Sequence, residues 1–196
     1  MPGQRAQISI SSQGTQESRA NIPSKRHNQQ GDLSHTRLSW ADNSLTEGDL
    51  IMGEANKTAI ATLVERAARY TMLVHLPNGH DAEVVRDGLI ATISTLPTHL
   101  RGSLTWDQGA EMAQHKQFGM ATDMAVYFCD PASPWQRGTN ENTNGLLRQY
   151  FPKGTDLSAF GAEDLEHVAQ QLNGRPRKTL DWDTPAERLR DLLTTE

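Results

Sequence analysis

The chain has 196 residues, enough for one globular domain with a tail but too few for two well-packed domains of usual size. No apolar run approaches the roughly 20 residues that span a bilayer, and the N-terminus lacks the apolar block of a signal peptide, which excludes the membrane and secreted classes. A single cysteine permits no internal disulfide, so a reducing cytosol is expected. The net charge is −5, and residues 1–46 hold five Lys/Arg against three Asp/Glu, which leaves 14 against 21 in an acidic remainder whose phosphate chemistry would need a bound cation.

Residues 1–46 are rich in Ser, Gln, Asn, Arg and Gly and lack apolar periodicity, which predicts a disordered or loosely attached arm. Residues 47–196 are predicted to form the folded domain, which begins with apolar strands at 49–53, 58–65 and 70–76. The later elements are predicted to be a helix, a strand, a helix, a strand and three helices, at 80–96, 102–106, 109–122, 124–129, 141–151, 161–173 and 184–193. The order βββαβαβα indicates an α/β fold.

Three carboxylates stand where such a fold gathers functional groups, at strand ends and at the start of the following helix. Asp49 lies in the first predicted strand, Asp107 follows the fourth, and Glu141 opens the helix after the fifth. A small set of this kind can hold two divalent ions about 3.5 to 4 Å apart and leave coordination positions free for a substrate phosphate. The alternative is that all three are ordinary solvated loop residues.

The helix that begins at Glu141 strengthens the metal-site hypothesis. Asn144 and Arg148 follow at i+3 and i+7, so a carboxylate, an amide and a guanidinium share one helix face and could meet a metal, a base edge and a phosphate in turn. A surface helix with modest ion pairing is the competing interpretation.

Long motifs in residues 47–193 resemble the catalytic half of the transposases of the insertion-sequence thirty family. The resemblance rests on EGDLIMG, TLVERAARYTMLVHLP, LTWDQGAEMAQHKQF, YFCDPASPWQRGTNENTNGLLRQYFPKGTD and LNGRPRKTLDWDTPAERL. It implies a ribonuclease H-like integrase core with a mixed five-stranded sheet flanked by helices. It also implies that the catalytic triad of Asp49, Asp107 and Glu141 binds two Mg²⁺ or Mn²⁺ ions, and that Arg148 contacts DNA.

The activity that this resemblance implies is cleavage of DNA at transposon ends and joining of the 3′ hydroxyl to target DNA, in the cytoplasm of a bacterium and at the nucleoid when bound. The implied partners are both DNAs, a second copy of the chain or a full-length transposase, and no membrane. Members of the family begin with a helix-turn-helix region, which residues 1–46 do not resemble. We therefore expect an N-terminally truncated or frameshifted form, and a second hypothesis is a catalytically silent inhibitor of full-length transposase. A third is a product that folds poorly and has no function.

Five further residues are candidates for supporting roles. Glu111 and His115 lie four residues apart in one predicted helix and could support Asp107 from outside the metal site, or form an ordinary surface pair. Trp135 could stack on a DNA base, although packing under its loop is the stronger expectation. Arg137 and Lys153 flank the Glu141 helix and are predicted to contact DNA, with solvated surface charge as the alternative.

Overall fold

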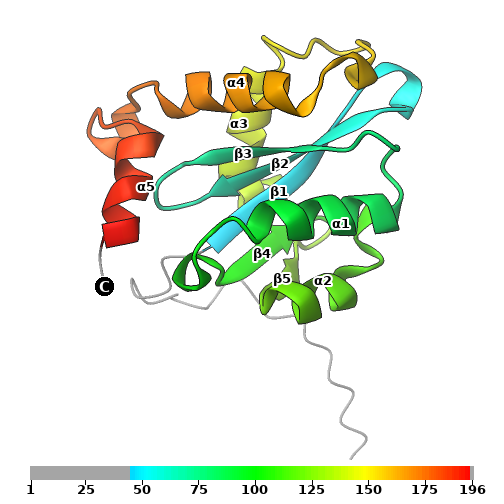
Figure 1. Cartoon of the computed structure of the whole chain (residues 1–196), viewed down its shortest axis with the longest axis horizontal. Helices are drawn as coiled ribbons and strands as arrows, with labels where there is room; N and C mark the ends of the chain where they lie inside the picture. The colour runs from blue at the N-terminus through cyan, green and yellow to red at the C-terminus, as the bar shows by residue number, and fades with distance from the viewer. Residues whose placement is uncertain (1–44, 195–196) are drawn as a thin grey trace, which may run out of the picture.

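A computed structural model describes residues 45–194 as one sheet with helices on both faces (Figure 1). The strands are β1 (Leu45–Met52), β2 (Ala59–Glu65), β3 (Thr71–His75), β4 (Ser103–Trp106) and β5 (Ala125–Phe128). The helices are α1 (Ala82–Ile93), α2 (His115–Thr122), α3 (Gly138–Leu147), α4 (Ala162–Asn173) and α5 (Pro185–Thr194). The predicted order βββαβαβα is confirmed. The predicted arm lies almost wholly outside the described residues, and β1 begins two residues before the predicted domain start.

The sheet is mixed and five-stranded, in the order β3-β2-β1-β4-β5. The pairs β1–β2 and β2–β3 are antiparallel, whereas β4 runs parallel to both β1 and β5. Strand β2 is buried along its whole length because it lies between two other strands and under helices on both faces. In the parallel pairing of β1 with β4, Glu47 lies opposite Thr105. Two residues further along both segments, the same register sets Asp49 beside Asp107.

Side chains of β1 alternate between two hydrophobic cores. Leu50 packs into the core under α1 and α2, whereas Ile51 packs into the core under α3 and α4. Glu47 and Asp49 have the same parity as Ile51, so both carboxylates face α3. Trp106 ends β4 fully buried in the first core, which leaves the next residue, Asp107, to face α3 as well.

The predicted single helix over 109–122 is wrong. Residues Ala110–Met112 form one 3-10 turn, and α2 begins only at His115. The indole N–H of Trp106 donates to Glu111 at 3.0 Å, which holds the turn against the end of β4. The carboxylate of Glu111 folds closely over Gly109, where a Cβ atom would lie 2.0 Å from Glu111 Oε1. These local contacts of Glu111 accompany the break in the predicted helix.

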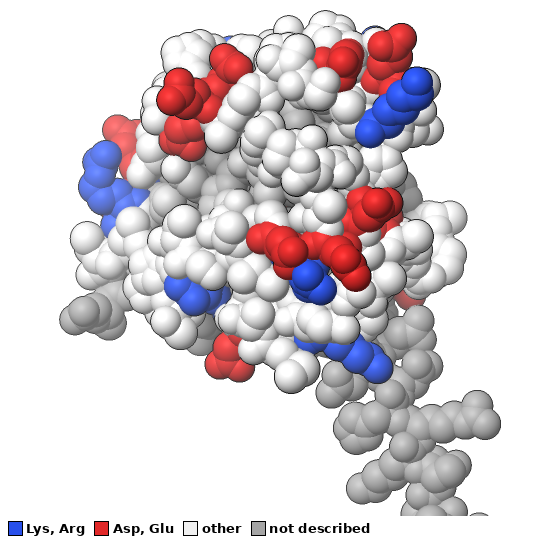
Figure 2. Space-filling model, turned by 45° about the vertical axis from the view of Figure 1, so that its right-hand side comes forward, with Lys and Arg blue, Asp and Glu red and all other residues white. Residues whose placement is uncertain are grey.

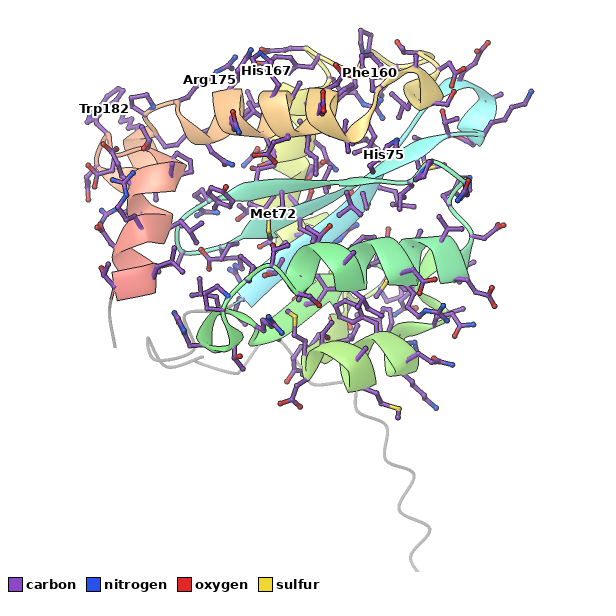
Figure 3. All side chains as sticks on the ribbon, viewed as in Figure 1. Met72, His75, Phe160, His167, Arg175 and Trp182 are labelled. Atoms are coloured by element: carbon purple, nitrogen blue, oxygen red, sulfur yellow. The ribbon has the colours of Figure 1, made fainter. Side chains whose placement is uncertain are left out.

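Helix α4 completes the second core, whereas α5 lies at one end of the sheet and packs Leu189 and Leu192 against the first core. Leu165 and Leu172 of α4 pack with Leu147 of α3 in the second core. Where α4 passes into α5, Arg175 lies over the ring of Tyr150 at 5.7 Å from its centroid, and Figure 3 labels it at this end of the molecule near Trp182. Among residues 45–194, no helix has both the length and the apolar character needed to cross a bilayer.

Candidate active site

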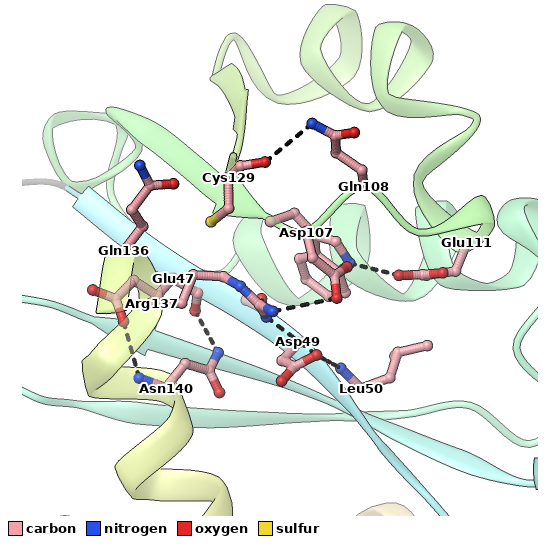
Figure 4. Close-up of polar contacts among 12 residues, drawn as sticks. Glu47, Asp49, Leu50, Asp107, Gln108, Glu111, Cys129, Gln136, Arg137 and Asn140 are labelled. Carbon is pink, nitrogen blue, oxygen red and sulfur yellow. Dashed lines mark hydrogen bonds and ion pairs between the residues drawn. The ribbon is translucent and has the colours of Figure 1, made fainter. Parts of the chain in front are cut away.

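Asp49 and Asp107 lie side by side on the α3 face of the sheet (Figure 4). Asp49 is in the middle of β1, where its backbone is fixed by pairing with Thr62 of β2, and Asp107 is the first residue after β4. Although 58 positions separate them in the sequence, the parallel pairing of β1 and β4 holds them together. The predicted convergence of the two aspartates at one edge of the site is therefore present in the fold.

Arg137 bridges the two aspartates. Its Nη1 lies 3.2 Å from Asp49 Oδ1, and its Nη2 lies 3.2 Å from Asp107 Oδ2, as Figure 4 shows. Nη1 also donates to the carbonyl oxygen of Gly48 at 3.1 Å, so the guanidinium is anchored to β1. Its side chain is only 15% exposed, because residues 134–137 form a 3-10 turn that delivers it under the start of α3. The predicted DNA contact is thus a counter-ion of the carboxylates in this structure.

Both aspartates carry a raised pKa. Burial raises the pKa of Asp49, and the guanidinium of Arg137 and the N–H of Leu50 oppose that effect only in part. Burial also raises the pKa of Asp107, to which the negative charge of Glu111 adds, while Arg137 again lowers it. Arg137 therefore compensates only part of the cost of burying the negative charge of these two carboxylates.

The raised pKa predicts that Asp107→Asn melts higher than the wild type in metal-free buffer at neutral pH. The folded-state pKa of Asp107 lies above its ordinary value of 3.8, so the native state binds more protons than the unfolded state between these two values. Stability of the wild type rises as pH falls through that window, whereas the variant lacks this dependence. Thermal melts in EDTA should show the gap in melting temperature between Asp107→Asn and the wild type shrinking from pH 7 to pH 4. An Asp107→Asn variant that melts lower than the wild type at pH 7 would contradict this prediction.

Glu141 lies on α3 next to this pair without joining it. Asn144, one turn further along, donates from Nδ2 to Asp49 Oδ2 at 3.0 Å, and Arg137 lies four residues before Glu141. Glu141 therefore occupies the turn between two residues that contact Asp49, on the same helix face, with its side chain exposed. Within residues 45–194, no three acidic, His or Cys side chains are gathered closely enough to hold a metal ion.

Several oxygen atoms here are suited to a hard cation. Within the described part of the chain, Asp107 Oδ1 and Asn144 Oδ1 are buried and receive no hydrogen bond. Carboxylate and amide oxygens are the ligands that Mg²⁺ takes in proteins, and buried oxygens without donors are costly unless a cation or water satisfies them. Asp49, Asp107 and, on the adjacent turn, Glu141 and Asn144 therefore fit a divalent ion in the chemistry of their donors.

The other predicted DNA contacts differ in how they are held. Arg148 donates from Nη1 to the carbonyl oxygens of Met52 at 3.1 Å and Phe151 at 3.3 Å, so it ties α3 to the end of β1. Lys153 is exposed beyond α3. Trp135 is 73% exposed on the turn before Arg137, contrary to the expectation that it packs under its loop.

The two residues predicted to support Asp107 take different positions. Glu111 lies beside Asp107, whose pKa it raises, and accepts a hydrogen bond from the indole of Trp106. His115 instead lies 3.0 Å, at Nδ1, from the carbonyl oxygen of Met112 and packs edge-on against Phe128. The split of the predicted helix explains this, because Glu111 and His115 no longer share one helix face.

Sequence reasoning missed a buried polar cluster beneath α3, made of Glu47, Thr62 and Asn140. Asn140 is fully buried, Glu47 is 1% exposed, and Thr62 Oγ1 donates to Asn140 Oδ1 at 2.9 Å. One signal was available: Glu47 and Asp49 are two residues apart in a strand, so both must lie on the same face of the sheet. Nothing in the sequence indicates that Asn140 rather than Glu141 points inward.

A cavity lies beside the site, and elsewhere the surface carries charges of both signs. A cavity of about 410 Å³ lies beside Asp107 and Arg137 and is lined further by the loop 130–133. Figure 2 shows, on one face of the molecule, Lys/Arg and Asp/Glu scattered among neutral residues rather than gathered by sign.

The chain is similar in sequence to known integrases and transposases. Residues 41–134 match the integrase core domain family. The chain is 53% identical over 147 residues to the transposase for insertion sequence element IS1086 of Cupriavidus metallidurans, which covers 75% of this chain and 43% of that protein. It is 56% identical over 141 residues to the transposase InsI for insertion sequence element IS30A of Escherichia coli, covering 72% of this chain and 36% of that protein.

A solved structure gives the same fold at low sequence identity. A chain in the cryoEM structure of a simian T-cell lymphotropic virus intasome in complex with PP2A regulatory subunit B56 gamma aligns with a TM-score of 0.58 and 18% identity. The alignment covers 74% of this chain and 53% of that one. The ribonuclease H-like integrase fold is therefore confirmed. The chain spans about two fifths of the length of the curated relatives it matches.

Proposed function

Because the chain carries an integrase core domain and is homologous to IS30-family transposases over about three quarters of its length, we propose that it cleaves and joins DNA phosphodiesters in DNA transposition. The observation that carries the proposal is the pair formed by Asp49 and Asp107, which the β1–β4 register holds together under α3. Homology to transposases favours this activity over the inhibitor hypothesis.

Asp49, Asp107 and Glu141 are the proposed ligands of two Mg²⁺ or Mn²⁺ ions. Such ions, when bound, activate an attacking water or 3′ hydroxyl and stabilise the leaving oxygen of the phosphodiester. The aspartates contribute fixed negative charge on rigid strands, and Asn144 orients Asp49 through the 3.0 Å hydrogen bond to Oδ2. Support for a cation comes from the buried oxygen of Asp107 that receives no hydrogen bond from residues 45–194.

The proposed DNA contacts surround these carboxylates. Arg137 and Arg148 flank α3 at its two ends, where the first pairs with both aspartates and the second donates to backbone carbonyl oxygens, and Lys153 is exposed after α3. Guanidinium and ammonium groups in this arrangement would bind backbone phosphates, whereas Asn144 and the exposed indole of Trp135 offer an amide and a stacking surface to bases. Glu111 is proposed to support Asp107 from the side away from Arg137, and His115 to stabilise the turn behind it.

The proposed partners are transposon-end DNA and target DNA. A second copy of the chain or a full-length transposase is a further proposed partner, since the solved relative is part of an intasome. Because the chain spans only part of its relatives, its activity is best tested on a substrate that needs no recognition of transposon ends.

A branched DNA that mimics the joined product provides such a substrate, since a reversible joining step can be run backwards on it. The purified chain is expected to release the branch and reseal the target strand with Mn²⁺ or Mg²⁺, and to do neither in EDTA or with Ca²⁺. Products are resolved on a denaturing gel with one strand labelled. Release without resealing would indicate hydrolysis alone, and the absence of any metal-dependent product with protein in excess over DNA would contradict the proposal.

A further inference from the structure

Asn140 is the residue immediately before Glu141, yet it points the opposite way. Its side chain is fully buried between α3 and the sheet, while Glu141 is exposed on the same helical turn. A fully buried amide is costly unless each of its polar atoms has a partner, so the contacts of Asn140 decide whether it can be held there.

Every hydrogen-bonding group of this amide is satisfied by β1 and β2. Its Nδ2 donates to the carbonyl oxygens of Glu47 at 3.0 Å and Thr62 at 3.3 Å, and its Oδ1 accepts from Thr62 Oγ1 at 2.9 Å. The backbone N–H of Asn140 donates to Glu47 Oε2 at 2.9 Å, so the carboxylate also satisfies a free N–H of the first turn of α3. Figure 4 shows Asn140 and Glu47 linked beneath the start of α3.

The cluster is tied to the position of Asp49 as well. Thr62 lies opposite Asp49 in the β1–β2 pairing, and its hydroxyl lies 3.3 Å from the carbonyl oxygen of Asp49. On the other side, Arg66 Nε lies 3.0 Å from Glu47 Oε1, which holds that carboxylate in place. The amide of Asn140 therefore ties the first turn of α3 to Glu47 in β1 and to Thr62 in β2, both of which are neighbours of Asp49 in the sheet.

We propose that Asn140 is a positioning residue that sets Glu141 over Asp49, with Thr62 and Glu47 as its anchors. The inference rests on the proposed function, in which Glu141 is the third carboxylate. Asn144 and Arg148 also hydrogen-bond α3 to β1, but they lie about one and two turns beyond Glu141, whereas Asn140 anchors the turn that carries it. The directional hydrogen bonds of Asn140 fix one position, and a displacement of about 1 Å at a catalytic group can lower a rate about 100-fold.

The test is a graded series at Thr62, which is fully buried and is itself neither a proposed metal ligand nor a proposed DNA contact. Thr62→Ser keeps the hydroxyl donor, Thr62→Cys replaces it with a weaker one, and Thr62→Val removes it at nearly constant shape. Thr71→Val is the matched control, because Thr71 is another buried strand threonine whose hydroxyl has no hydrogen-bond partner among residues 45–194.

The readouts are kcat and KM on branched DNA, the Mn²⁺ concentration for half-maximal rate, and hydrogen exchange of the first turn of α3 without metal. We expect Thr62→Val to lower kcat at least about tenfold with little change in KM, to raise the Mn²⁺ requirement severalfold and to speed exchange at the Asn140 amide. Thr62→Ser and Thr71→Val should stay within about twofold of wild type, and Thr62→Cys should lie between.

Two results would overturn the inference. If Thr62→Val keeps the wild-type kcat and Mn²⁺ requirement, Asn140 is only a packing residue, even where the variant melts lower. If Thr62→Val does not fold, an unchanged kcat and Mn²⁺ requirement in Thr62→Cys leads to the same conclusion. A wild type that shows no metal-dependent reaction contradicts the proposed function itself, which is a different outcome from an active wild type with an insensitive series.

Discussion

Asp107→Asn is expected to lower metal-dependent cleavage of branched DNA at least about 100-fold, which corresponds to about 2.7 kcal/mol of transition-state stabilisation. The change keeps the shape of the side chain but removes the charge with which Asp107 would bind a divalent ion beside Asp49. Activity should fall while the chain remains folded, because burial already penalises this carboxylate in metal-free buffer. The rate is measured with Mn²⁺ and Mg²⁺ at saturating DNA.

Asp123→Asn provides the matched control for this experiment. Asp123 is exposed at the end of α2 in the left-handed conformation, with φ of 58°, which asparagine adopts readily. It should cleave at the wild-type rate and melt at the wild-type temperature. An Asp107→Asn chain that keeps more than about a tenth of the activity would remove Asp107 from the catalytic set.

Arg137→Gln is expected to destabilise the metal-free protein and at the same time to tighten Mn²⁺ binding. Without the guanidinium, the half-buried Asp49 and Asp107 face each other with no opposite charge between them. We expect a loss of about 1 kcal/mol, at the low end for a charge-assisted pair because the side chain of Asp107 is 44% exposed. A divalent ion no longer competes with Arg137 for the same oxygens, so Mn²⁺ affinity should rise at least about threefold.

Thermal melts in EDTA and a Mn²⁺ titration of the shift in melting temperature measure these two effects separately. Arg86→Gln is the control, since Arg86 pairs with the exposed Asp87 at 2.7 Å far from any predicted ligand and should change neither quantity. Weaker Mn²⁺ binding by Arg137→Gln would contradict the interpretation that Arg137 stands where a cation binds, and would instead make it a support for the ligands.

The succession of strands and helices along the chain could be predicted because apolar runs of five to eight residues are separated by clear turns. The break before α2 could not, since the residues between Gly109 and Thr122 have a helical pattern that gives no sign of the hydrogen bond between Trp106 and Glu111. Helix boundaries elsewhere moved by a few residues, as at α3, which begins at Gly138 rather than Glu141. Tertiary contacts decide such ends, and a sequence pattern does not record them.

At the site, the sequence predicted that the aspartates lie close together but not which side chains they contact. Asp49, Asp107 and Glu141 were predicted to converge at one edge of the sheet. The β1–β4 register brings the two aspartates together, although Asp49 lies within its strand, and Glu141 stays beside the pair. The ion pairs of Arg137 with both aspartates depend on the path of the loop before α3, which no periodicity describes. Whether Asn140 or Glu141 points inward depends on how α3 is rotated about its own axis. The start of α3 is polar all round, so no hydrophobic pattern in the sequence predicts that rotation.

The parallel register of β1 and β4 also determines where the chain can tolerate changes in length. The stretch from Gly53 to Gly102 contains a hairpin, a helix and several turns, and residues added at its exposed tips leave the alignment of Glu47 with Thr105 intact. One residue inserted between Glu47 and Asp49, or between Thr105 and Asp107, would move an aspartate to the opposite face of the sheet, beneath α1. Natural variation in length is thus expected to collect in the first region and to be absent from the two short strand segments.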